Sequence, residues 1–129
     1  MAIIKPKCSL WGKKFSPKKL LVIPNIIIKH SNEPEDYNSK NSATTYNYGA
    51  CYIETPREIK NHLRIEWMLD YILEHREKFE KSGATDIVFE VDWYGLQGNM
   101  EFNVIEIKKL ALLEIPFSLD YIQQESDDE

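Results

Sequence analysis

The stretch 83–121 constrains the fold more than any other part of the chain. Its core, residues 86–93 (DIVFEVDW), alternates between apolar and polar side chains at every position except Val88. The apolar side chains that share one face are Ile87, Phe89, Val91 and Trp93. This alternation predicts a strand with one face on a hydrophobic core and the other open to water or to a partner.

The remaining elements follow from hydrophobic period, caps and turn residues. We expect strands over 3–11, 25–29, 46–54 and 117–122, a short helix after Ser16-Pro17, and longer helices over 58–81 and 101–114. Residues 31–44 are polar and predict an exposed loop. Pro6 cannot donate to a ladder, which places the first strand at an edge or a bulge. The order β-α-β-β-α-β-α-β predicts an α+β two-layer sandwich, with an antiparallel or mixed sheet, helices on one face and a ferredoxin-like arrangement.

The 129 residues fit one domain, which we assign to 1–122, followed by an acidic flexible tail over 123–129. No apolar run approaches the ~18 residues of a membrane span. The first residues lack the pattern of a secretion signal. We therefore expect a cytoplasmic protein that does not enter membranes.

Charge is distributed unevenly along the chain. Residues 1–30 hold seven lysines and no acid, whereas residues 31–129 hold nine basic and 21 acidic side chains. An acidic body argues against general nucleic-acid binding and favours a basic protein partner.

The sequence contains no motif for catalysis, and we expect neither an enzyme nor a cofactor. The helical residues His62 and His75 are 13 positions apart, so they cannot share a metal as an i, i+4 pair would. His30 has no other histidine or cysteine near it in the sequence, and we expect Cys8 and Cys51 to be small buried hydrophobic residues. No catalytic or metal residue is therefore nominated.

Two acidic faces and one aromatic stripe predict a protein-binding surface. Glu66 and Asp70 lie on an acidic line of the long helix, and Glu90 and Asp92 are neighbours on one strand face. Trp67 and Tyr71 belong to a second apolar stripe of the long helix, and both residue types are favoured at interfaces. The predicted contact set is Glu66, Trp67, Asp70, Tyr71, Glu90 and Asp92.

Two other hypotheses about the function remain open. Four lysines surround the start of the first helix, and a helix N-terminus with cations can attract an anion or small ligand. These residues are Lys13, Lys14, Lys18 and Lys19. The other reading is a structural homodimer joined through an edge strand or through the stripe that contains Trp67.

Several landmarks resemble a bacterial family of small domains of unknown function. They are Gly12, Phe15-Ser16-Pro17, Tyr48-Gly49-Ala50, Asn99-Met100-Glu101-Phe102, Lys109-Leu110-Ala111 and Ser118-Leu119-Asp120-Tyr121. The resemblance implies an α+β fold and supplies no catalytic residue. Some small acidic proteins act as immunity proteins beside secreted toxins, and by analogy we expect a domain that neutralises a basic toxin.

Overall fold

The computed structural model describes residues 2–38, 41–95 and 100–123. Five strands form the main sheet in the order β2-β5-β1-β6-β7, and β3 and β4 form a separate pair. The strands are β1 (Ile3–Gly12), β2 (Ile28–Asn32), β3 (Tyr37–Asn38), β4 (Asn41–Thr45), β5 (Gly49–Glu54), β6 (Asp86–Gly95) and β7 (Phe117–Gln123). The helices are η1 (Pro17–Val22), η2 (Asn61–Leu63), α1 (Arg64–Lys81) and α2 (Val104–Leu113).

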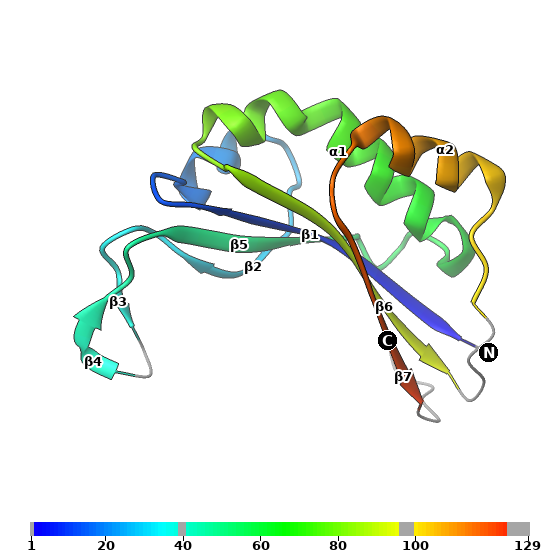
Figure 1. Ribbon diagram of the computed structural model, residues 1–129, viewed down its shortest axis with the longest axis horizontal. Helices are drawn as coiled ribbons and strands as arrows, with labels where there is room; N and C mark the ends of the chain where they lie inside the picture. The colour runs from blue at the N-terminus through cyan, green and yellow to red at the C-terminus, as the bar shows by residue number, and fades with distance from the viewer. Residues whose placement is uncertain (1, 39–40, 96–99, 124–129) are drawn as a thin grey trace.

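The sheet is mixed, and its helices cover one face. β1 pairs antiparallel with β5 and β6, β2 pairs antiparallel with β5, and β6 pairs parallel with β7. Figure 1 shows α1 and α2 side by side on the same side of the sheet. The predicted α+β two-layer sandwich is therefore confirmed, whereas the ferredoxin-like arrangement is not.

The core lies between the sheet and α1. The buried face of β6 is the one that the alternation predicted. Phe89 and Val91 are almost fully buried, and Ile87 and Trp93 lie beside them in the same cluster. The predicted core face of the long helix is confirmed as well, because Ile65, Met68, Leu69, Ile72 and Phe79 are all buried.

Several elements differ from the predictions, and the strands predicted over 25–29 and 46–54 cover Ile28–Asn32 and Gly49–Glu54 instead. Residues 31–44 are not simply a loop, since β2 reaches Asn32 and β3 and β4 pair with each other. The long helix begins at Arg64 rather than at residue 58. The Arg64 guanidinium donates hydrogen bonds to the carbonyls of Ile59 (2.9 Å) and Arg57 (3.3 Å), and these bonds hold residues 57–59 out of the α-helix. The first helix is a short 3₁₀ helix.

The prediction for Pro6 is also wrong, because β1 is the central strand of the sheet. Pairing with β5 extends only to Lys7 and Glu54, although β1 stays paired with β6 as far as Ile3. The carbonyl of Pro6 accepts a bond from Thr55 Oγ1 at 3.1 Å, on the side that β5 has left. The missing N–H therefore falls where one ladder ends, and no bond is lost.

The second helix covers residues 104–113 instead of 101–114. Asn103 is its N-cap: Asn103 Oδ1 accepts from the Glu106 N–H, and Glu106 Oε1 accepts from the Asn103 N–H, both at 2.8 Å. This capping box fixes the start of the helix and buries the Glu106 side chain against the protein. The predicted turn over 95–98 and the predicted tail over 123–129 fall mostly outside the described residues, although Gln123 belongs to β7.

Candidate functional site

The six predicted contact residues are spread over three surfaces. Glu66 and Asp70 lie on the flank of α1 that meets α2. Trp67 and Tyr71 follow them by one position each, which turns them about 100° around the helix. Glu90 and Asp92 lie on the sheet face turned away from the helices, because the alternate side chains of β6 form the core. A single partner surface therefore cannot contain all six.

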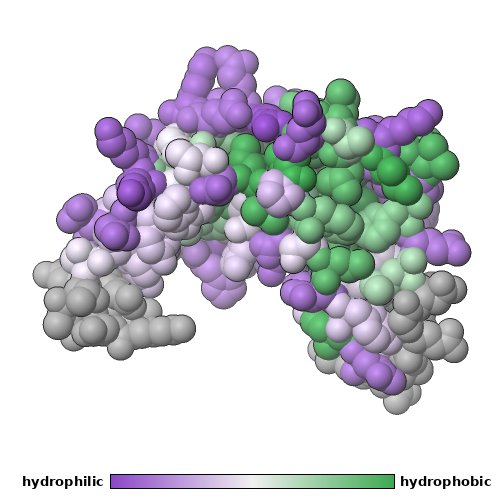
Figure 2. Space-filling model, in the orientation of Figure 1, coloured by the Kyte–Doolittle hydropathy of each residue, from purple (hydrophilic) through white to green (hydrophobic). Residues whose placement is uncertain are grey.

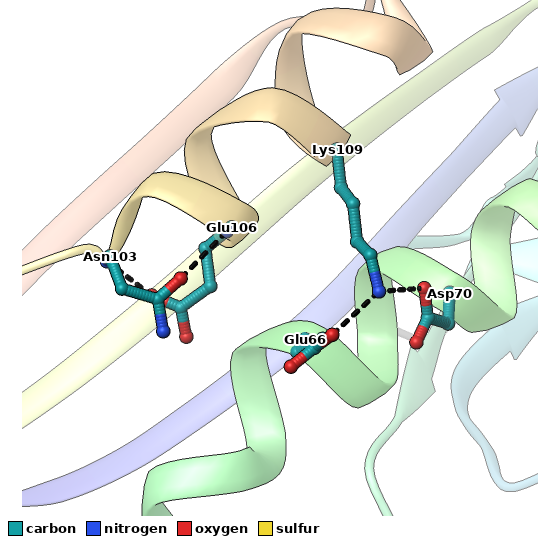
Figure 3. A network of polar contacts seen from close by, with 5 residues as sticks. All are labelled: Glu66, Asp70, Asn103, Glu106 and Lys109. Atoms are coloured by element: carbon teal, nitrogen blue, oxygen red, sulfur yellow. Dashed lines mark hydrogen bonds and ion pairs between the residues drawn. The ribbon is translucent and has the colours of Figure 1, made fainter.

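Glu66 and Asp70 are already paired within the molecule. Lys109 of α2 places its Nζ 2.6 Å from Glu66 Oε2 and 2.6 Å from Asp70 Oδ1 (Figure 3). The hydrogen bonds to Asp70 and Glu66 raise the pKa of Lys109, so the ammonium stays charged. This three-residue network fastens α2 to α1 and offsets the acidic charge that the sequence suggested for a basic partner.

Trp67 and Tyr71 form part of an aromatic column along α1. The ring centroids of Trp67 and Tyr71 are 4.8 Å apart, and those of Tyr71 and His75 are 4.5 Å apart. Trp67 and Tyr71 are partly buried and pack against the core. Burial, with a contribution from the charge of Glu74, raises the pKa of Tyr71 to about 12. The column therefore packs α1 against the core.

Glu90 and Asp92 face lysines of the neighbouring strand β1. Lys7 Nζ lies 3.4 Å from Asp92 Oδ2, and Lys7 is also the register partner of Glu90. Partial burial alone would lower the pKa of Lys7, but the charges of Asp92 and Glu90 outweigh it and raise that pKa. Burial, together with the charges of Asp92 and Asp120, raises the pKa of Glu90 against the opposing effect of Lys7. Asp92 is thus paired within the sheet, whereas for Glu90 the charge of Lys7 only partly offsets burial and the charges of Asp92 and Asp120.

The predicted anion site at the first helix is occupied by the protein's own carboxylate. Glu33 Oε2 accepts from the Lys18 N–H at 2.9 Å, and Glu33 Oε1 accepts from the Ser16 hydroxyl. The lysines at this end of the chain are exposed to solvent; they are Lys13, Lys14, Lys18 and Lys19. An external anion would have to displace Glu33 from the helix start, so the geometry weakens this reading.

Metal and thiol chemistry find little support in the described segments. Across residues 2–38, 41–95 and 100–123, no group of three or more His, Cys, Asp or Glu side chains is placed to hold a metal ion. Cys8 and Cys51 are free and buried. Burial raises the pKa of the Cys51 thiol to about 12 and raises that of Cys8 further, so both remain protonated thiols.

The outward face of α2 is apolar, and the sequence reasoning did not identify it. Its large side chains are between 54% and 69% exposed: Val104, Ile105, Ile107 and Leu112. We call these four residues the α2 apolar face. In Figure 2, hydrophobic residues gather over the region where Figure 1 places α1 and α2. Large exposed apolar patches on soluble domains mark sites of association.

The direction of this face follows from the helix period. Lys109 points toward α1, and Ile107 lies about 200° around the helix from it. Glu106 and Leu113 are the buried residues of α2. Ile107 therefore points away from α1, toward the outer edge of the sheet where β7 lies.

β7 is an edge strand of the five-stranded sheet, and the described residues place no strand on its outer side. Phe89 N–H donates to the Pro116 carbonyl at 3.0 Å, just before β7 begins. Backbone groups alternate in direction along a strand, so the N–H and C=O of Phe117, Leu119 and Tyr121 point toward the free edge. Such an edge can pair with another strand.

Phe117 lies at the start of the edge strand β7, on the sheet face that the helices cover. Its ring is 39% exposed, yet it stacks on Phe89 at 5.5 Å and meets Phe102 edge-on at 5.3 Å. Two signals in the sequence could have indicated this surface. The segment VIEIKKLALL has apolar residues all around the helix, and the sequence places a strand after it.

Comparison of the chain with protein-family models, with curated proteins and with solved structures gives no match. Among the described residues, none of the helices has the length and apolar character needed to span a membrane.

Proposed function

We propose that the chain is a non-enzymatic protein-binding domain of the cytoplasm, and that a second copy of the chain occupies its main binding surface. The α2 apolar face carries this proposal, because its large apolar side chains are exposed and one of them, Ile107, points toward an unpaired strand edge. Water contact with this much apolar surface is unfavourable, and association would remove it.

The surface is complementary to itself. A two-fold axis at β7 would join two edges antiparallel and would place α2 next to its copy, with Ile107 turned toward the contact. A register centred on Leu119 pairs Phe117 with Tyr121 and brings the outward N–H and C=O groups of both strands together. In that register Asp120 lies opposite Ser118 rather than opposite another acid. Like charges therefore do not oppose the pairing.

The size of the surface indicates a small contact between the two copies. α2 has ten residues and β7 has seven. Stable interfaces use roughly 20–30 residues and about 800 Å² on each side. Glu106 and Leu113 of α2 are buried and Lys109 faces α1, so the outward residues of the two elements form a contact smaller than that range.

A toxin-neutralising role through acidic surfaces has less support than self-association. Lys109 pairs with Glu66 and Asp70, and Lys7 faces Glu90 and Asp92. A basic partner would have to compete with these lysines on two different sides of the molecule. The immunity-protein reading therefore stays an expectation from the analogy.

Sedimentation equilibrium of the wild type and of Ile107→Glu tests the proposal. We expect the wild type at twice the chain mass of 15.2 kDa and the variant at 15.2 kDa. The reason is that Ile107→Glu places a charge on each side of an apolar contact, where it would lose hydration without a partner.

Val22→Glu is the matched control, because Val22 is 73% exposed on η1, away from the proposed surface. This variant should keep the doubled mass. A wild type that sediments as a single chain, or an Ile107→Glu variant that stays dimeric, would contradict the proposal.

A further inference from the structure

A second site lies on the open side of the sheet, where two strands separate. β5 leaves β1 after the pair Lys7–Glu54, while β1 remains paired with β6 as far as Ile3 and Tyr94. A pocket of about 430 Å³ lies in this fork. Its volume is within the range of small-molecule sites, which is roughly 300–1,000 Å³.

The lining of the pocket is basic although the chain is acidic. Five basic and two acidic side chains line it, whereas the whole chain carries a net charge of −5. Two of the basic groups are committed to the protein itself. Lys7 pairs with Asp92, and the buried Arg64 guanidinium binds the carbonyls of Ile59 and Arg57.

The other three cations are available to a ligand. Lys5, Lys29 and Arg57 are exposed, and their side chains form no hydrogen bond or ion pair with any described residue. Lys5 Nζ lies 5.2 Å from the ring centroid of Tyr94, a contact that holds the ammonium at the pocket wall. The Arg57 carbonyl is fixed by Arg64, so the backbone that carries the guanidinium is anchored.

The geometry points to a small phosphate monoester of sugar size as the ligand of this pocket. A phosphate monoester carries a charge of about −1.5 to −2 and three strong acceptor oxygens, which three separate cations can share. Arg57 offers the planar fork that binds two phosphate oxygens at once, and Lys5 and Lys29 act as point charges. A carboxylate has a single charge and would leave part of this positive potential unbalanced.

Titration with three ligands of the same body tests this assignment by NMR of backbone amides. The ligands are glucose 6-phosphate, glucose 6-sulfate and glucose, which carry close to two, one and no negative charges. We expect glucose 6-phosphate to bind about tenfold more tightly than the sulfate, with shifts concentrated at Lys5, Lys29 and Arg57, and glucose to produce none. Inorganic phosphate should bind more weakly than glucose 6-phosphate, because it fills little of the pocket.

Lys29→Ala and Arg57→Ala should each weaken glucose 6-phosphate by about tenfold. Lys19→Ala removes the same charge from an exposed lysine of η1 and should leave the affinity unchanged. Three results would overturn the assignment. They are an absence of shifts at millimolar ligand, equal affinity for glucose 6-phosphate and glucose 6-sulfate, and equal affinity for glucose 6-phosphate and inorganic phosphate. Equal weakening by Lys19→Ala would also overturn it, since binding would then follow net charge alone.

Discussion

Replacing Phe89 with alanine should lower the free energy of unfolding by about 4 kcal/mol. Phe89 is fully buried at the centre of β6, and its ring stacks on Phe117 at 5.5 Å. Its N–H also donates to the Pro116 carbonyl, where β7 begins. Truncation would remove the packing of one large ring and would leave a cavity between the sheet and the helices.

Urea unfolding measures this loss, and the Ile107→Glu background keeps dimer formation out of the comparison. Val88→Ala is the control, because Val88 lies in the same strand as Phe89 but points to the open face of the sheet. This control should cost less than about 1 kcal/mol. A loss from Phe89→Ala no larger than that from Val88→Ala would show that β6 does not form the core strand.

Replacing Gly49 with alanine should cost about 3 kcal/mol, the upper part of the range for overpacked sites. A Cβ at Gly49 would lie about 1.8 Å from the Phe15 carbonyl oxygen and about 2.8 Å from its carbonyl carbon. Both are backbone atoms, and the Phe15 ring is fully buried, so the segment cannot easily move away. Gly49 is thus required by a close approach of two backbones.

The same unfolding experiment with Ala50→Ser provides the comparison. Ala50 is the next residue of β5 and is partly exposed on the open face. Its substitution should change the free energy of unfolding by no more than about 0.5 kcal/mol. If Gly49→Ala changed the free energy of unfolding as little as Ala50→Ser, the close approach of Gly49 to the Phe15 backbone would be contradicted.

Local pattern was sufficient where burial followed a simple period. The alternation around Phe89 placed β6 and its buried face, and the stripe through Met68 and Ile72 placed the buried face of α1. The longest aliphatic side chains of each element repeat on one side, so the sequence favoured one orientation for β6 and for α1. The α+β sandwich followed from those orientations.

Pattern failed where long-range partners decided the outcome. α2 is apolar all round, so its period did not indicate that Ile107 would face outward while Glu106 became buried in a capping box. Lys109 reaches acids some forty positions earlier in the chain, and Glu33 reaches back to the start of η1. The sequence shows these charges but not their pairing.

Hydrogen exchange of the β7 amides tests the proposed dimer most directly. The amide of Leu119 points to the free edge, whereas the amide of Asp120 points to β6. In the wild type at dimeric concentration, we predict that both amides are protected from exchange. In Ile107→Glu, protection should be lost at Leu119 and kept at Asp120. Equally fast exchange of Leu119 in both proteins would contradict the account.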